Sequence, residues 1–237
     1  MAGVGVILQA RMGSTRLPGK VLRPLAGVPM LGRILDRLGR CRAVDRLVVA
    51  TSDRPADDAV AAFVADRGVG LFRGSETDVL DRYHQCAAAF GFDVVVRATG
   101  DNPFVDPEEG DRLIAFLFEQ GLDYACAFPD FGSGLPVGVG LEVMTAEALS
   151  RSWRHGCDAN HREHVNEYIQ ERPALFRQAV PGTPPDKRAP GLRLTVDTPE
   201  DFHRAETLHA AYGAERGEGE PDTPWLVAAA RTRGWVS

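Results

Sequence analysis

Three cations lie close together in one short segment near the start of the chain. Residues 9–20 read Gln-Ala-Arg-Met-Gly-Ser-Thr-Arg-Leu-Pro-Gly-Lys and follow directly after an apolar run. Arg11, Arg16 and Lys20 supply positive charge, the hydroxyls of Ser14 and Thr15 can donate, and the two glycines let backbone N–H groups turn toward an anion. These residue types favour the binding of a polyphosphate, and a triphosphate is the expected ligand. The alternative is a basic turn whose charges are solvated.

Two common phosphate-binding motifs do not fit this segment. A Walker P-loop places four residues between its first glycine and Gly-Lys, which Ser or Thr then follows. Here five residues separate Gly13 from Gly19, and Val21 follows the lysine. The dinucleotide-binding fingerprint also fails, because Leu8 stands where its third glycine belongs. The segment therefore belongs to neither class.

Two acidic residues follow apolar runs further along the chain. Asp101 comes shortly after the run at 94–97, and Asp197 comes directly after the run at 192–196. Mg²⁺ in proteins usually takes one or two carboxylates and completes its shell with phosphate oxygens and water. The sequence therefore predicts that Asp101 and Asp197 hold Mg²⁺ or Mn²⁺ beside the basic segment. The alternative is that each carboxylate only caps the helix that follows it.

The segment from Ile7 to Leu22, Ile-Leu-Gln-Ala-Arg-Met-Gly-Ser-Thr-Arg-Leu-Pro-Gly-Lys-Val-Leu, resembles the opening of the cytidylyltransferase superfamily. That superfamily includes the CMP-Kdo and CMP-sialic acid synthetases, and the resemblance is greatest to its spore-coat polysaccharide branch. Gly-Asp-Asn-Pro at Asp101 and Val-Asp-Thr-Pro-Glu-Asp at Asp197 are similar to its two metal-binding segments. With further similar segments, the resemblance spans residues 4 to about 210.

The resemblance implies an enzyme that uses CTP as a substrate, with Mg²⁺ or Mn²⁺, to convert a sugar or sugar acid into its CMP derivative. The implied catalytic residues are Arg11, Lys20 and Asp101. The implied nucleotide-binding residues are Leu8, Gln9, Ala10, Arg11, Ser14, Arg16, Lys20, Asp53, Thr99 and Gly100. The acceptor would contact Arg73, Arg97 and His164, and the metal Asp101 and Asp197. A sugar hydroxyl would attack the α-phosphorus in line and expel pyrophosphate, for a surface polysaccharide or glycan.

Two other functions stay open at the level of the sequence. A GT-A-type glycosyltransferase would use a sugar nucleotide, but it usually carries an Asp-x-Asp motif, and the segment at Asp101 lacks the second aspartate. A non-catalytic nucleotide-binding protein of the same fold would keep the basic segment without the reaction.

Short apolar runs alternate with amphipathic helical stretches, a rhythm typical of βαβ units. We expect an α/β fold with a Rossmann-like, mostly parallel, GT-A-like sheet flanked by helices, together with a small inserted α+β lobe. In open α/β sheets ligands bind at the carboxyl ends of the strands, where the basic segment and both acids would meet. The predicted strands are 4–8, 47–50, 69–72, 94–97, 124–128, 140–144, 176–180 and 192–196.

The first part of the chain is the more regular, so we expect a single nucleotidyltransferase domain at 1–212. Within it, 129–191 includes stretches rich in glycine and proline and is expected to form an insertion. By analogy with the family, that insertion would bind the acceptor and form the interface of a homodimer. Residues 213–237 are expected to form a connection, which we expect to be mobile at 213–224, and a short last helix.

Composition excludes several broad classes. The 237 residues carry 27 basic and 33 acidic side chains, a net charge of −6, which argues against binding nucleic acid through bulk charge. No apolar run approaches the roughly 20 residues of a membrane span. With neither nucleic acid nor a membrane expected as a partner, the expected partners are small-molecule substrates. The four cysteines are scattered without a CxxC pair, which indicates reduced thiols and a cytoplasmic location.

Overall fold

A computed structural model describes residues 2–236 of the chain. A seven-stranded sheet in the order β5-β4-β1-β6-β8-β7-β9 forms its centre. The strands of this sheet are β1 (Val4–Gln9), β4 (Arg46–Ser52), β5 (Gly70–Gly74), β6 (Val94–Thr99), β7 (Tyr124–Cys126), β8 (Glu142–Thr145) and β9 (Gln178–Ala179). A separate antiparallel ribbon is formed by β2 (Pro24–Leu25) and β3 (Val28–Pro29).

The prediction of a mostly parallel α/β sheet flanked by helices is confirmed. The strands β5, β4, β1 and β6 are parallel to one another, and β7 is parallel to β9. Only β8 runs antiparallel to both of its neighbours in this sheet. The strands β8 and β9 come from 129–191, so the expected insertion extends the central sheet.

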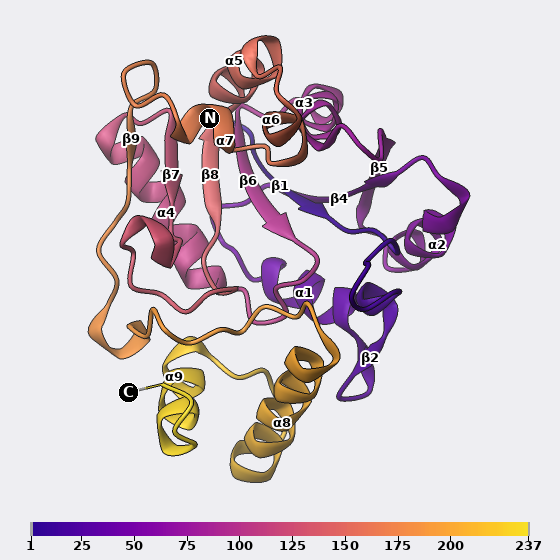
Figure 1. The fold of residues 1–237 in the computed structure, drawn as a ribbon, viewed down its shortest axis with the longest axis vertical. Helices are drawn as coiled ribbons and strands as arrows, with labels where there is room; N and C mark the ends of the chain where they lie inside the picture. The colour runs from indigo at the N-terminus through magenta and orange to yellow at the C-terminus, as the bar shows by residue number, and fades with distance from the viewer. Residues whose placement is uncertain (1, 237) are drawn as a thin grey trace.

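Helices cover both faces of the sheet, and Figure 1 shows α3, α5, α6 and α7 on one side with α8 and α9 on the opposite side. Because side chains alternate along a strand, Leu8 of β1 packs in the core beside α1, α4 and α8, whereas its neighbour Ile7 packs beside α3 and α5. The helices are α1 (Met30–Leu38), α2 (Asp58–Asp66), α3 (Val79–Phe90), α4 (Pro107–Gln120), α5 (Ala146–His155), α6 (Ala159–Glu163), α7 (Glu167–Gln170), α8 (Pro199–Arg216) and α9 (Thr223–Thr232). The 3-10 turns are η1 (Lys20–Leu22), η2 (Pro55–Asp57), η3 (Pro129–Phe131) and η4 (Pro185–Lys187).

The strand predicted at 192–196 is wrong, because this extended segment does not join the sheet. It makes one isolated parallel bridge, between Arg193 and Val137. A Cβ on Gly138, whose φ is +90°, would lie 2.5 Å from the backbone nitrogen of Thr195, so only glycine allows this close approach. The apolar alternation did mark buried side chains correctly, but the hydrogen-bond partner of the segment is a loop.

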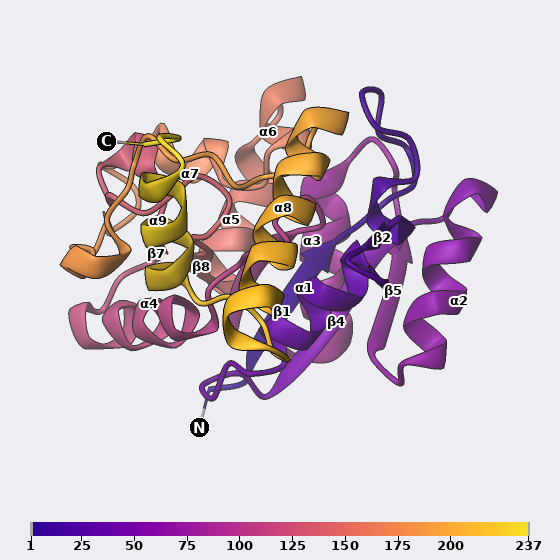
Figure 2. The ribbon, with the colours of Figure 1, turned by 90° about the horizontal axis from the view of Figure 1, so that it is seen from below.

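The end of the chain returns to the rest of the molecule. Figure 2 shows α8 and α9 side by side, and α8 continues past residue 212 to Arg216. In the connection between these helices, Glu220 forms an ion pair with Arg33 of α1, and the carbonyl oxygen of Pro221 accepts a hydrogen bond from Arg37. The connection is therefore anchored at its carboxyl-terminal end. Within the described residues, no helix combines the length and apolar character needed to cross a membrane.

Candidate functional site

A polar hollow of about 260 Å³ opens where β1 and β6 end. The two strands pair in parallel with Gln9 opposite Thr99, so their carboxyl ends lie at the same edge of the sheet. Just beyond, the N–H of Gly100 donates to the carbonyl oxygen of Gln9 at 2.8 Å. A Cβ on Gly100 would lie 3.0 Å from that oxygen, so glycine permits the close contact between the strand ends. The lining residues are Gln9, Ala10, Arg11, Gly13, Ser14, Thr15, Arg16, Lys20, Val21, Thr99, Gly100, Asp101 and Asp197.

The basic segment after β1, which we call the phosphate loop (residues 10–20), closes on the peptide of Met12. The carbonyl oxygen of Met12 accepts hydrogen bonds from the N–H groups of Ser14, at 2.9 Å, and Gly19, at 3.1 Å. Gly19 has a φ of +70°, a left-handed conformation that glycine adopts without strain. The next residue, Lys20, begins the turn η1. The loop thus has a defined shape with cations on both sides of its closure.

The carboxylate of Asp197 lies among three cations. Lys20 Nζ is 3.1 Å from Asp197 Oδ1 and also donates to the carbonyl oxygen of Val196 at 2.6 Å. Arg16 approaches the same Oδ1 at 3.2 Å, and Arg193 bonds to Oδ2 at 2.5 Å. Burial alone would raise the pKa of Asp197, but the hydrogen bond from Lys20 and the three positive charges hold it below its usual value. Asp197 is therefore ionised at neutral pH.

Asp101 has different surroundings. Its carboxylate accepts a hydrogen bond from the hydroxyl of Thr99, and its backbone oxygen accepts one from the N–H of Val196 at 2.8 Å. No lysine, arginine or histidine within residues 2–236 forms an ion pair with it. The backbone bond to Val196 brings Asp101 and Asp197 to neighbouring positions in the hollow.

The two carboxylates fit a divalent cation of the Mg²⁺ or Mn²⁺ type. Both offer hard oxygen donors at the rim of a polar hollow, and within residues 2–236 no cationic side chain forms an ion pair with Asp101. Across the residues that the structure describes, no group of three or more His, Cys, Asp or Glu side chains gathers as potential metal ligands. A cation held by Asp101 and Asp197 would thus need phosphate oxygens and water to complete its coordination.

The structure brings most of the predicted nucleotide and metal residues together in the hollow. They are Gln9, Ala10, Arg11, Ser14, Arg16, Lys20, Thr99, Gly100, Asp101 and Asp197. Two predicted residues lie outside it: the side chain of Leu8 is fully buried in the core, and Asp53 is exposed after the end of β4. The roles of all these residues stay predictions.

Two of the three predicted acceptor residues are engaged in contacts away from the lining of the hollow. Arg73 forms an ion pair with Asp58 at 2.7 Å and donates to the carbonyl oxygen of Ser52 at 3.0 Å. Arg97 forms a buried ion pair with Glu142 of β8. The guanidinium group of Arg73 thus binds to the end of β4 and the start of α2, and that of Arg97 binds to β8.

The third predicted acceptor residue, His164, is exposed at the end of α6. Its neighbour Glu163 forms an ion pair with Arg11 of the phosphate loop, with 3.7 Å between Nη2 and Oε1. This contact places α6 beside the phosphate loop. The end of α6, which belongs to the expected insertion, is therefore close to the hollow.

Sequence reasoning missed Arg193 and did not single out Val21 of the loop as a site residue. Arg193 lies four positions before Asp197, and this spacing was the available signal. It also missed Asp57, whose carboxylate accepts a hydrogen bond from the N–H of Met12 at 2.6 Å. No local pattern indicated that contact, because it joins separate connections of the sheet.

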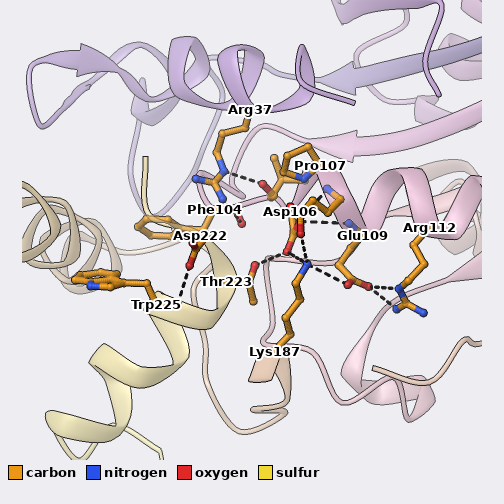
Figure 3. Close-up of polar contacts among 12 residues, drawn as sticks. Arg37, Phe104, Asp106, Pro107, Glu109, Arg112, Lys187, Asp222, Thr223 and Trp225 are labelled. Atoms are coloured by element: carbon orange, nitrogen blue, oxygen red, sulfur yellow. Dashed lines mark hydrogen bonds and ion pairs between the residues drawn. The ribbon is translucent and has the colours of Figure 1, made fainter. Parts of the chain in front are cut away.

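Behind the loop that carries Asp101, a buried polar network holds α4 in place (Figure 3). Asp106 caps α4, and its carboxylate also accepts hydrogen bonds from Lys187 Nζ, at 2.9 Å, and Thr223 Oγ1, at 2.6 Å. Lys187 also pairs with Glu109 at 3.3 Å. Burial alone would raise the pKa of Asp106, but the hydrogen bonds from Thr223 and Lys187 lower it. The network thus joins α4 to η4 through Lys187 and to α9 through Thr223, and it fixes the turn between Asp101 and α4.

Comparison with known families identifies one match across most of the chain. The family model described as "Cytidylyltransferase" matches residues 5–219. The chain is 42% identical over 212 residues to the spore coat polysaccharide biosynthesis protein SpsF of Bacillus subtilis, covering 87% of this chain and 86% of SpsF. It is 38% identical over 246 residues to a 3-deoxy-manno-octulosonate cytidylyltransferase of an Anaeromyxobacter species, covering 89% of this chain and 98% of that protein.

Solved structures share the same architecture. A cytidylyltransferase from Leptospira borgpetersenii superposes with a TM-score of 0.88 at 29% identity, covering 99% of this chain and 96% of that one. The fold is also that of a CMP:2-keto-3-deoxy-manno-octonic acid synthetase, with a TM-score of 0.67 at 20% identity over 89% of this chain and 99% of the synthetase.

Proposed function

The chain belongs to the cytidylyltransferase family and is a nucleotidyltransferase, and from this premise we propose that it uses CTP to activate a sugar or sugar acid as its CMP derivative. One observation carries the proposal: the three cations of the phosphate loop and the carboxylates of Asp101 and Asp197 share one hollow. Relatives named for a sugar acid and for spore coat polysaccharide support an acceptor of that class and a product used in a surface polysaccharide or glycan.

We propose that the phosphate loop holds the triphosphate of CTP. Backbone N–H groups around Gly13 and the hydroxyl of Ser14 would donate to phosphate oxygens, and Arg11 would bind near the α-phosphate. Arg16 and Lys20 would then face the β- and γ-phosphates. Selection of cytosine would fall to backbone groups of residues 8–11 and to Thr99.

Asp101 and Asp197 would hold the divalent cation. When bound, Mg²⁺ or Mn²⁺ neutralises phosphate charge and lowers the pKa of a coordinated hydroxyl. The ionised state of Asp197 at neutral pH suits this role. Thr99 would orient Asp101 through the hydrogen bond between their side chains.

The transfer itself needs alignment and charge stabilisation more than covalent help from the protein. The sugar oxygen forms a bond to the α-phosphorus while the bond to the bridging oxygen of pyrophosphate breaks, and the hydroxyl proton passes to water. Lys20 and Arg16 would stabilise the charge that develops on the departing pyrophosphate. The segment at Glu163 and His164, which contacts the loop through Arg11, would lie on the acceptor side.

A homodimer formed through 129–191 is a further part of the proposal. Phe131 and Leu175 of this region expose 47% and 52% of their surface, large fractions for apolar side chains. Size-exclusion chromatography with light scattering measures the mass directly, and a monomer would contradict the expectation.

The cytoplasmic location stays a prediction from the distribution of cysteines.

A thermal-shift screen with CTP, UTP, GTP and ATP, each with Mg²⁺, tests the nucleotide. A ligand at 100 times its Kd stabilises the folded state by about 2.7 kcal/mol, so CTP should raise Tm by roughly 5–10 °C and the other nucleotides by less. Stronger stabilisation by UTP or GTP than by CTP would contradict the choice of CTP and favour a glycosyltransferase that uses the corresponding sugar nucleotide.

Pyrophosphate release in the presence of CTP and a panel of sugars and sugar acids tests the reaction. We expect release with at least one acceptor and none without it. Binding of CTP without release by any acceptor would favour a non-catalytic nucleotide-binding protein.

A further inference from the structure

Asp57 is a buried aspartate that faces the phosphate loop from the next connection of the sheet. It lies at the end of η2, directly before α2, and exposes 3% of its surface. Its Oδ1 accepts a hydrogen bond from the N–H of Met12 at 2.6 Å, and its Oδ2 accepts one from the hydroxyl of Ser52. One carboxylate thus joins the end of β4 to the loop after β1.

The position of Asp57 in the chain would suit a different and more common task. Aspartate immediately before a helix usually bonds to the first free N–H groups of that helix. Asp57 is at this N-cap position of α2, yet its side chain makes no capping hydrogen bond. Its two carboxylate oxygens instead accept hydrogen bonds from Met12 and Ser52, so Asp57 connects the loop to β4 and does not cap α2.

Met12 is the residue on which the loop closes, so the position of its backbone sets the position of the residues on either side of it. Its N–H bonds to Asp57, and its carbonyl oxygen accepts from both Ser14 and Gly19. The bonds fix the peptide groups on both sides of Met12, so they orient Arg11 before it and the turn that leads to Lys20 after it. A hydrogen bond to a charged acceptor is stronger than one between neutral groups, which suits this anchoring task.

The other end of the anchor is itself held firmly. Ser52 is fully buried, and its hydroxyl accepts a hydrogen bond from the N–H of Arg54 at 3.2 Å. Arg73 of β5 donates to the carbonyl oxygens of Ser52, at 3.0 Å, and Arg54, at 2.9 Å. The position of Asp57 is therefore set by two strands of the sheet, which is how precise binding sites are supported.

We propose that Asp57 is the positioning residue of the phosphate loop: it holds the Met12 peptide so that the cations and N–H groups of the loop are preorganised for the triphosphate. This inference rests on the proposed function, because it takes the loop to be where CTP binds. The carboxylate acts through Met12 and does not itself line the hollow.

The test compares D57A, D57N and a matched control, D45A, by CTP affinity and by hydrogen exchange of the loop. In D57N the amide oxygen still accepts from Met12 and the amide NH₂ donates to the Ser52 hydroxyl, so the anchor persists. Asp45 bonds the backbone N–H of Val4 at 2.8 Å, at the opposite end of β1. We expect D57A to weaken CTP binding about tenfold and to speed exchange of the Met12 amide, with D57N within about threefold of wild type and D45A unchanged in both.

Several results would overturn the inference. They are wild-type CTP affinity in a folded D57A, equal loss in D57N and D57A, or an equal loss in D45A. If D57A does not fold, S52A removes the other half of the anchor, and an unchanged CTP affinity in S52A would equally refute the role. If the wild type itself binds no CTP, the proposed function fails, and exchange of the Met12 amide in D57A still decides whether Asp57 fixes the loop.

Discussion

Lys20 and Lys187 are the two lysines of the chain, and both are buried against carboxylates. Lys20 meets Asp197 inside the hollow, whereas Lys187 meets Asp106 and Glu109 behind it. Long flexible lysine side chains are seldom buried unless they are paired. The two residues have the same chemistry, but one faces a polar hollow and the other closes a network of protein groups.

We expect Lys20→Ala to lower the rate of pyrophosphate release at least a hundredfold. The substitution removes a charge from a site where an aligned cation would stabilise the leaving group, an effect worth about 2.7 kcal/mol or more. Steady-state kinetics with CTP and an accepted sugar measure the loss. As a control, Arg46→Ala removes an exposed charge at the amino end of β4 and should leave turnover unchanged. Turnover within a few-fold of wild type in Lys20→Ala would contradict the proposed role.

Asp101→Asn should also lower turnover at least a hundredfold, because an amide oxygen is a weaker ligand for a hard cation than a carboxylate. Titration with Mg²⁺ should show that the concentration needed for half-maximal activity rises in the same variant. Asp66→Asn, an exposed substitution at the end of α2, is the matched control for the loss of one negative charge. An unchanged dependence on Mg²⁺ would remove Asp101 from the metal site.

At the scale of the elements, the hollow is built by connections that meet beyond the ends of strands. The phosphate loop extends β1, Gly100 and Asp101 extend β6, and 192–197 reaches the same place as an extended segment outside the sheet. Only the first two are aligned by strand pairing. The third is held by backbone bonds from Val196 to Asp101 and from Leu194 to Val137, each 2.8 Å long.

The network around Lys187 links η4, α4 and α9, so its loss should be costly for stability. We expect Lys187→Met to lower the free energy of unfolding by about 3–5 kcal/mol, because it leaves Asp106 buried without its cation and leaves Glu109 with Arg112 alone. Urea denaturation measures this change. Glu108→Ala is the control, because the side chain of this third partner of Lys187 is 84% exposed, and it should cost less than about 1 kcal/mol. Equal effects of the two variants would refute a special role for the buried pair.

At the scale of the whole molecule, the last part of the chain packs against α1 around a buried histidine. His209 of α8 stacks on Phe104 with 5.1 Å between the ring centroids. Burial, together with the charges of Arg33 and Arg37, lowers the pKa of His209 to about 3. The imidazole is therefore neutral in the folded protein at every pH above this value.

This lowered pKa predicts that the protein loses stability in acid. Between about pH 6.5 and pH 3 the unfolded chain binds a proton at His209 that the folded chain does not, so the free energy of unfolding falls as the pH falls. The loss from this group is roughly 3–5 kcal/mol in total. The lowered pKa values of Asp106 and Asp197 add a further loss that begins near pH 4, where the same carboxylates of the unfolded chain become protonated first.

Urea denaturation at several pH values measures how steeply the free energy of unfolding changes with pH, which we call the slope. His209→Leu should flatten it between pH 6.5 and pH 4, since across the described residues Nε2 of His209 has no hydrogen-bond partner that leucine would leave unsatisfied. His203→Gln, on the exposed side of the same helix, should leave the slope unchanged. A wild-type slope in His209→Leu would show that other groups cause the acid sensitivity.

The sequence predicted the fold class and most of the hollow because these depend on local patterns. Short apolar runs, helical periodicity and the glycines and cations of residues 9–20 all act within a few positions of one another. Parallel strands place their carboxyl ends at one edge of a sheet, which is why the basic segment and Asp101 are predicted to lie together, and the pairing of Gln9 with Thr99 brings them there. The same reasoning could not separate a strand from an extended segment at 192–196, since both bury alternate side chains.

The sequence by itself therefore determined the α/β class, the phosphate loop and the two candidate metal carboxylates. Only the tertiary structure decided which groups meet: Lys20 with Asp197, which lie 177 positions apart, Asp57 with Met12, and Arg97 with Glu142. The physical reason is that such pairs form only after the sheet and helices have packed. Many groups in the chain could pair with a given charged side chain, and packing brings only some of them within hydrogen-bond distance.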